Sequence, residues 1–354
     1  LVINGNSVFR ANGLNITIGG SLVNSNSTSG QGLTTGGYQP GTSNQVTSFN
    51  GTGSRSITGS GSNLTNFANL TISSSGTLAL TTGSNIRVNG NMSLLSGTFE
   101  DGGNTISLTG NLQNSAVHTS SAAGGGIILE GSYTQVISGN GKGCFGNITL
   151  NNTTGINLVD NATINGILTF SMGSLYIDDY LLTLGENSSI AGIPDKNNMI
   201  ILNGVISDAG LRKIFPSGAA GFSFPVGVAG KYTPASFVFA ANSNINSSIT
   251  VVPVNYHHPL AALPQGDELD YYWNVISDGF SGTFNVTHSY SYLEEDVNGT
   301  ESSYVTGRFL NGIWIPDGGI NESSVNPATH QITLSDRDFI DGEYTAGSSL
   351  NFST

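Results

Sequence analysis

Acidic residues gather in short stretches of the second half of the chain, where their oxygens could hold a metal ion. One stretch contains Glu294, Glu295, Asp296, Asn298 and Glu301, all within eight residues. Calcium takes about six to eight oxygen ligands from carboxylates and carbonyls, commonly in flexible loops. The stretch is therefore a candidate calcium site, although its spacing does not match that of the EF-hand loop.

Two further acidic stretches have the same oxygen chemistry. One contains Asp336, Asp338, Asp341 and Glu343, and the other contains Asp267, Glu268 and Asp270. The alternative interpretation is that all of these are solvated turns that keep an acidic surface soluble. Calcium is the only cofactor that the sequence suggests.

The histidines offer little for a zinc site. His257 and His258 are adjacent. Neighbouring residues of a strand point to opposite faces, so the two side chains cannot readily coordinate the same ion. The other histidines are isolated in the sequence: His118, His288 and His330. We expect no zinc site.

Groups for catalysis are also sparse, and we expect no enzyme activity. Polysaccharide lyases, a class of enzyme built on β-helices, need a basic residue beside acidic groups, and a glycosidase needs two carboxylates flanking a cleft. Asp178 and Asp179 are adjacent in an expected turn. The basic residues of the first half are scattered: Arg10, Arg55, Arg87, Lys142 and Lys196. A carbohydrate-active β-helix enzyme of the lyase type, or its carbohydrate-binding module, is the alternative function.

The composition indicates which elements must position these residues. The 354 residues include 49 glycines, and only 9% are Asp, Glu, Lys or Arg. Ser, Thr, Asn and Gly, which dominate the polar residues, disfavour helix. The composition therefore predicts an all-β protein. A net charge of −13 at pH 7 excludes a general nucleic-acid binder, which needs a basic face. No apolar run is long enough to insert into a membrane.

The first half of the chain repeats itself. Phe67, Asn69 and Leu70 recur as Phe145, Asn147 and Ile148, 78 residues later, and VNGNMSLLSGTF at 88–99 matches INGILTFSMGSL at 164–175, 76 residues later. A third match, between residues 14 and 104, has an offset of 90. These offsets indicate two superrepeats of about 76–90 residues.

Shorter units within each superrepeat predict a parallel β-helix. Triplets such as Leu70-Thr71-Ile72 alternate apolar and polar residues and are separated by turns with Gly or Asn. Such units bury their apolar edges only when they stack as the coils of a solenoid. An up-and-down barrel, the alternative, would need longer strands and hairpin turns. Asn and Thr at matching positions can form ladders along the coils, and a strict Thr file, which the sequence lacks, would indicate ice binding.

From residue 222 the strands lengthen and aromatic residues accumulate. Phe284, Val286, His288 and Tyr290 alternate with small polar residues, which is typical of a strand with one buried face. Seven or more such strands, separated by Gly, Pro and Asn, predict a β-sandwich. Its tryptophans are expected to be core anchors, or alternatively platforms on which a sugar stacks: Trp273 and Trp314.

Charge and composition place the domain boundaries. Residues 1–200 carry a net charge of −3, and residues 201–354 carry −10. We therefore expect a β-solenoid over 1–195, a junction with the last coils over 196–221, and a β-sandwich over 222–354. The chain begins directly with strand-like Leu1-Val2-Ile3 and shows neither a signal peptide nor an anchor. It is expected to be a piece of something longer.

Several of these motifs together resemble a known family. FxGxGxxxITGS at 49–60, FxNLTI at 67–72, VNGNMSLLSGTF at 88–99, FPVGVAGKYTPASF at 224–237 and YYWNV at 271–275 look like large secreted surface proteins of the Bacteroidetes. Those proteins join adhesin-like β-solenoid repeats to β-sandwich modules. They are typically exported by the type IX secretion system through a C-terminal sorting domain, and its absence from this sequence is what we expect of an internal fragment. Some relatives act in gliding motility or attachment.

The resemblance and the lack of catalytic groups together imply a role in attachment. We expect a non-catalytic, structural segment of a large extracellular, cell-surface adhesin or filament. Its partners would be a surface, a glycan or a neighbouring cell, together with further domains of the same long polypeptide. The solenoid would serve as a stalk, and the sandwich would cap the solenoid or present a binding surface.

Overall fold

The computed structural model is all-β, with a parallel β-solenoid followed by a β-sandwich, as predicted. It describes residues 1–28, 30, 32–59, 64–121, 124–261, 267–316, 322–337 and 340–352. The chain forms two units, which are described separately. Unit 1 consists of Leu1–Leu175 with Asn187–Ile193, and unit 2 consists of Tyr176–Glu186 with Pro194–Thr354.

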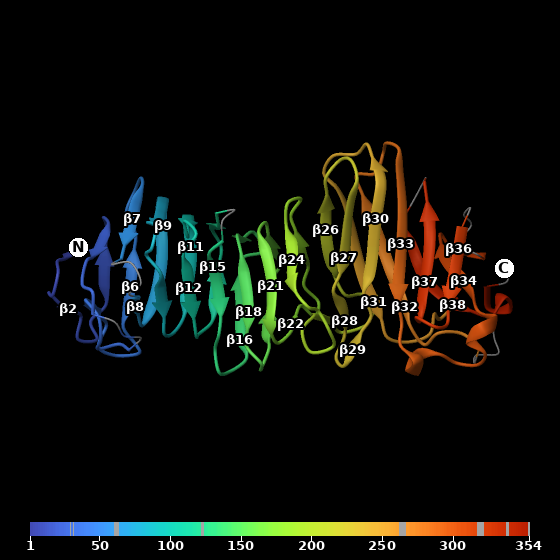
Figure 1. Ribbon diagram of the computed structural model, residues 1–354, viewed down its shortest axis with the longest axis horizontal. Coiled ribbons are helices and arrows are strands. Elements are labelled where there is room, and N and C mark those ends of the chain that lie inside the picture. Colours follow the sequence, from blue (N-terminus) through green and yellow to red (C-terminus); the bar gives the residue numbers. More distant parts are fainter. Residues whose placement is uncertain are drawn as a thin grey trace. The chain divides into compact units, whose positions relative to one another are not determined.

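Unit 1 is a stack of coils whose short strands pair in parallel on three faces (Figure 1, blue to green). The first face consists of β8 (Thr65–Phe67), β10 (Ile86–Val88), β12 (Thr105–Leu108), β15 (Gly126–Leu129), β18 (Ile148–Asn151), β21 (Ile167–Met172) and β24 (Ser189–Gly192). The second consists of β3 (Ile16–Ile18), β6 (Val46–Phe49), the first parts of β9 (Asn69–Leu80) and β11 (Met92–Glu100), β13 (Leu112–Asn114), β16 (Gln135–Gly139) and β19 (Ile156–Leu158). The third consists of β1 (Val2–Ile3), β4 (Leu22–Asn24), β7 (Arg55–Thr58), the last parts of β9 and β11, β14 (Val117–Thr119), β17 (Cys144–Phe145) and β20 (Ala162–Ile164). In addition, β2 (Phe9–Arg10) pairs with β5 (Tyr38–Gln39), and β22 (Leu175–Tyr176) stands where the two units divide.

The core of unit 1 consists of files of apolar side chains, one from each coil. Because the strands pair in register, the same position of each coil points inward along the whole stack. The file on the first face is buried and consists of Phe67, Val88, Leu108, Leu129, Leu150 and Phe170. Each such side chain contributes about 1.5–3 kcal/mol of burial free energy.

An asparagine ladder runs along one corner of the stack, as the sequence predicts. The side chain of Asn69 donates to the carbonyl of Gln45, and its Oδ1 accepts from Asn91 N–H at 2.9 Å. Asn91 Oδ1 then accepts from Asn111 N–H, and Asn111 Oδ1 accepts from Val136 N–H, both at 2.9 Å. The ladder therefore satisfies backbone donors that the corners leave out of the strand pairing.

The outward side chains of the first face are irregular. The file next to the apolar one consists of Asn66, Arg87, Ser107, Ile128, Thr149 and Thr169. A lattice-matched file of threonine, which ice binding would require, is not formed by these residues.

The first strands of unit 2 also pair in parallel, and this parallel pairing ends at one strand. β23 (Leu182–Leu184) pairs in parallel with β26 (Leu211–Phe215), and β25 (Ile200–Leu202) pairs in parallel with β28 (Val226–Val228). The other edge of β26 pairs antiparallel with β31 (Ser247–Val254). At β26 the parallel stack therefore becomes an antiparallel sheet.

Two antiparallel sheets of unit 2 form the β-sandwich (Figure 1, yellow to red). Beside β26, in this order, lie β31, β32 (Tyr272–Asp278), β38 (Gly342–Gly347), β34 (Val305–Leu310) and β35 (Ile313–Pro316). The facing sheet has the order β27 (Ala220–Phe224), β30 (Ala235–Asn242), β33 (Phe284–Ser291), β37 (Gln331–Asp336) and β36 (Glu322–Asn326). The remaining elements are β29 (Lys231–Tyr232), which pairs with β28, and the 3₁₀ turns η1 (Glu294–Asp296), η2 (Glu301–Ser303) and η4 (Ser349–Phe352).

Aromatic side chains fill the space between the two sheets. The rings of Trp273 on β32 and Tyr290 on β33 have centroids 5.3 Å apart, and Tyr290 stacks on Tyr344 of β38 at 5.0 Å. Trp273 is fully buried and Trp314 is 6% exposed, so both are core anchors. The inward-facing alternation predicted around Phe284 is confirmed along β33. Among the residues that the structure describes, no helix has the length and hydropathy of a membrane span.

Candidate functional site

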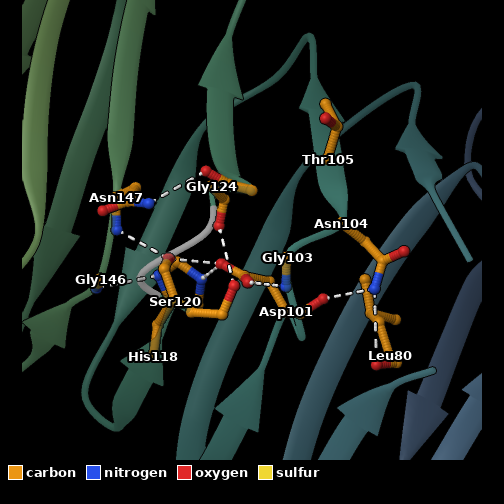
Figure 2. A network of polar contacts seen from close by, with 12 residues as sticks. Leu80, Asp101, Gly103, Asn104, Thr105, His118, Ser120, Gly124, Gly146 and Asn147 are labelled. Carbon is orange, nitrogen blue, oxygen red and sulfur yellow. Dashed lines mark hydrogen bonds and ion pairs between the residues drawn. The ribbon is translucent and has the colours of Figure 1, made fainter. Parts of the chain in front are cut away.

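The solenoid encloses a polar network of Asp101, His118 and Ser120 (Figure 2). His118 occupies an inward position of β14, paired in register with Phe99 of the preceding coil, and its ring stacks on Phe99 at 5.9 Å. An imidazole in an apolar file needs polar partners. Asp101, which directly follows β11, supplies one, with Oδ2 3.2 Å from His118 Nε2.

The donors around Asp101 hold its carboxylate in the charged form. Burial alone would raise the pKa of Asp101, but hydrogen bonds from His118, Ser120 and the backbone N–H of Gly103 outweigh it, so the pKa lies below its ordinary value. The Gly103 bond measures 2.8 Å. A buried carboxylate with several donors is a stable anion rather than a proton acceptor.

The three residue types match those of a catalytic triad, but their hydrogen bonds do not. A triad requires the serine hydroxyl to donate to the histidine. Here Ser120 Oγ donates to Asp101 and accepts from Asn147 N–H at 2.8 Å. His118 Nδ1 accepts from Gly146 N–H at 3.2 Å, so neither ring nitrogen is available as a base for Ser120. The network joins three successive coils and has the geometry of an internal brace (Figure 2).

A second buried network lies between the sheets of the sandwich. His288 Nε2 lies 2.7 Å from Asp336 Oδ2, and its Nδ1 lies 2.8 Å from the hydroxyl of Tyr290. The Arg308 guanidinium lies 3.6 Å from Asp336 Oδ1 and also donates to the backbone carbonyl of Asp341. Burial lowers the pKa of His288, against the opposing effect of Asp336.

All five histidines lie within 4 Å of a carboxylate, although the sequence showed them as isolated or merely adjacent. The pairs are His118–Asp101, His257–Asp270, His258–Glu343, His288–Asp336 and His330–Glu301. The partners are 13 to 85 residues apart in the sequence. In four of these pairs, all except His257–Asp270 at 3.9 Å, the histidine is at hydrogen-bond distance from the carboxylate, in a chain that has only ten Lys and Arg residues.

The candidate calcium ligands of the 294–301 stretch lie on and after η1. Glu294 and Glu295 are exposed, whereas Asp296 is buried with Oδ1 2.5 Å from Lys231 Nζ. The carboxylate of Glu301 accepts from the hydroxyl of Tyr292 at 2.6 Å and faces His330 at 2.9 Å. Protein donors thus already hold two of these carboxylates.

The remaining candidate ligands are also dispersed. Asn298 is half-buried, and its backbone N–H donates to Tyr304 Oη at 3.1 Å. Asp336 belongs to the buried network with His288, and Asp341 accepts from the backbone and hydroxyl of Ser277 at 2.6 and 2.8 Å. Asp338 lies outside the described residues. Within the described ranges, no group of three or more His, Cys, Asp or Glu side chains is placed to hold a metal ion.

Calcium binding therefore stays a prediction, and it has a direct test at the two exposed carboxylates. If η1 binds calcium, EDTA should lower the melting temperature of the chain, and the double variant Glu294→Gln, Glu295→Gln should melt alike with and without EDTA. The exposed Asp278→Asn on β32 is the matched control. A wild-type melt that EDTA does not change would contradict calcium binding.

Glu268 is a buried acidic side chain of unit 2. It is 2% exposed, and neither carboxylate oxygen has a hydrogen-bond partner among the described residues. Burial, aided by the nearby Asp270, raises its pKa to about 7. Its backbone is nevertheless held, because its carbonyl accepts from Asn298 N–H at 3.2 Å.

An open cleft of about 330 Å³ lies on unit 2 beside η1. Four segments line it: Lys231 on β29, Asn255 to His257 after β31, Asp270 before β32, and Glu295 with Asp296 on η1. The backbone N–H of Asp270 donates to the carbonyl of Asp296 at 2.8 Å and ties two of these segments together. Burial raises the pKa of Asp296, and Lys231 opposes this effect.

Comparisons with known proteins add no relative. No family model, curated protein or solved structure matches this chain. Function is therefore inferred from the residues and contacts described above.

Proposed function

We propose that the chain is a non-catalytic segment of a large extracellular, cell-surface adhesin or filament. The solenoid acts as a stalk, and the sandwich caps it and presents a binding surface. The partner is an abiotic surface, a glycan or a neighbouring cell. The motif resemblance to secreted Bacteroidetes surface proteins supports export by the type IX system and further domains in the same polypeptide.

The observation that carries this proposal is the double pairing of β26. One edge of β26 pairs in parallel with β23, and its other edge pairs antiparallel with β31. An open end of a β-solenoid exposes unpaired backbone groups and invites edge-to-edge association. A sandwich that begins by pairing with the final coil removes that edge, which suits a stalk that ends in a separate module.

The stalk role is further supported by the contacts between neighbouring coils of unit 1. Its apolar files run along the stack, the asparagine ladder joins the coils from Gln45 to Val136, and the Asp101 network joins three coils. Stability then arises from repeated contacts between neighbouring coils, which gives length and stiffness without surface charge.

Attachment is tested with beads that carry the 354-residue chain at one end. We expect coated beads to stay on glass, on glycan-coated slides or on a lawn of cells under flow that removes beads coated with albumin. Retention no greater than that of albumin beads on every one of these surfaces would overturn the proposal. An immunoblot of the surface fraction should also show a polypeptide far larger than 36.6 kDa.

The enzyme alternative is tested on the same preparation. Incubation with uronate-containing polysaccharides and calcium should produce no unsaturated, ultraviolet-absorbing ends. Their appearance would replace the proposed function with a lyase.

A further inference from the structure

We propose that Lys231 and Asp296 become joined by an amide bond between their side chains. The proposal concerns the chemistry of one ion pair in unit 2 and does not depend on the attachment function. Lys231 stands on β29 and Asp296 on η1, and the two residues are 65 positions apart in the sequence. The bond closes a loop that contains β30, β31, β32 and β33.

The two side chains already meet at a place where the carboxyl group is shielded from water. Lys231 Nζ lies 2.5 Å from Asp296 Oδ1, and the Asp296 side chain has no exposure, whereas that of Lys231 is 22% exposed. Taking two opposite charges out of water is costly, and both charges disappear when the pair becomes a neutral amide. Burial also raises the pKa of Asp296, which favours the carboxylic acid, the form that can lose a hydroxyl group.

The backbone around the pair holds the two groups in place. Leu293 N–H donates to the second carboxylate oxygen of Asp296 at 3.3 Å, and Asp270 N–H donates to the backbone carbonyl of Asp296 at 2.8 Å. Lys231 pairs with Val228 where β28 and β29 run antiparallel. A nucleophile and an acyl group that are held together react as one molecule, which removes much of the entropic part of the barrier.

The reaction is a condensation that needs no further reagent. A proton passes from Lys231 Nζ to the Asp296 carboxylate, and the resulting amine attacks Cγ of Asp296 to form the C–N bond. Glu295, whose Oε1 lies 3.6 Å from Nζ, takes a second proton from the nitrogen and passes it to the leaving hydroxyl group. The C–O bond breaks, and one water molecule departs into the open cleft of about 330 Å³ that Asp296 lines.

The mass of the whole 354-residue chain tests the proposal. After unfolding in denaturant, the wild type should be lighter than its sequence by about 18 Da, the mass of one water molecule. Trypsin cuts after lysine and arginine but does not cut after a lysine whose amine is acylated. It should therefore release residues 214–308 as one peptide, whereas an unlinked chain gives 214–231 and 232–308.

Two lysine variants locate the bond. Lys231→Arg keeps a positive charge opposite Asp296 but removes the nucleophilic amine, because a guanidinium group stays protonated. This variant should have the full mass, with the circular dichroism of the wild type as evidence that the fold is kept. Lys196→Arg, at an exposed position, is the matched control and should show the same mass loss as the wild type. A wild-type chain of full mass, or a mass loss that persists in Lys231→Arg, would overturn the proposal and leave Lys231 and Asp296 as an ion pair.

Discussion

Replacing Asp101 with alanine should destabilise the solenoid unit by about 3–5 kcal/mol. The substitution leaves the ring N–H of His118, the hydroxyl of Ser120 and the backbone N–H of Gly103 without their acceptor. Both His118 and Asp101 have side chains with no exposure, so water cannot easily replace the lost contacts. Each buried polar group left without a partner costs about 1–3 kcal/mol.

The loss should be visible in hydrogen exchange as well as in denaturation. The backbone amides of Gly103, Gly146 and Asn147 donate to the three side chains of the network. In Asp101→Ala these amides should exchange faster, whereas amides of the sandwich should keep their protection. Because the chain has two units, exchange resolved by residue distinguishes them better than a single unfolding curve.

Glu100→Ala is the control for this effect. Glu100 is the neighbour of Asp101 but is exposed at the end of β11. Its removal should change stability by less than about 0.5 kcal/mol. Equal losses for the two variants would show that the network does not brace the coils.

The Asp101 network also predicts a response to acid. The pKa of Asp101 is lower in the folded chain than in the unfolded chain, so its contribution is fully present above the unfolded pKa, near 3.8. The contribution should be lost as the pH falls below that value and through the folded pKa. Asp101→Asn, which cannot ionise, should lack this acid-dependent component.

Much of the fold follows from periodicity that is visible in the sequence. The triplet Leu70-Thr71-Ile72 alternates as predicted, with both leucine and isoleucine buried in β9. The alternation from Phe284 to Tyr290 likewise gives the buried face of β33. Both patterns are local, because a strand fixes the direction of every second side chain.

The buried networks could not be predicted in the same way, because their members meet through the stacking of distant segments. Asp101 and His118 are 17 residues apart, and His258 and Glu343 are 85 residues apart. The local pattern pointed the wrong way, since Val117 is the apolar residue of the triplet Val117-His118-Thr119 but is 41% exposed, whereas His118 is buried. A histidine in an inward file implies a buried partner, but the alternation does not identify which carboxylate supplies it.

The acidic stretches show the reverse case, in which residues that are close in the sequence do not act together in the fold. Clustering in the sequence suggested that the acidic residues from Glu294 to Glu301 would bind one ion together. In the fold, however, Asp296 forms an ion pair with Lys231, and Glu301 contacts Tyr292 and His330. Spacing within a loop does not determine where each side chain points once neighbouring strands supply donors. The same folding brings Asp270 and Asn255, from separate segments, to the cleft beside η1.

Glu268 should make the stability of unit 2 decrease as the pH rises from about 4.5 to 7. Its pKa is about 7 in the folded chain, above the ordinary value of 4.5. Between these two values the folded chain binds a proton that the unfolded chain has lost, so raising the pH favours unfolding. The stabilising contribution is complete below pH 4.5 and is lost as the pH rises through 7. The shift corresponds to about 3 kcal/mol.

The Glu268→Gln variant isolates this effect, because its amide has nearly the same shape and does not ionise. Its stability should exceed that of wild type at pH 7 and approach it at pH 4.5. All other ionisable groups are the same in both proteins, so their contribution cancels in the difference between the two curves. Glu294→Gln, at an exposed position of η1, should leave the wild-type pH dependence unchanged. Parallel curves for wild type and Glu268→Gln would mean that Glu268 obtains a partner in solution, and that its carboxylate remains charged inside the sandwich unit.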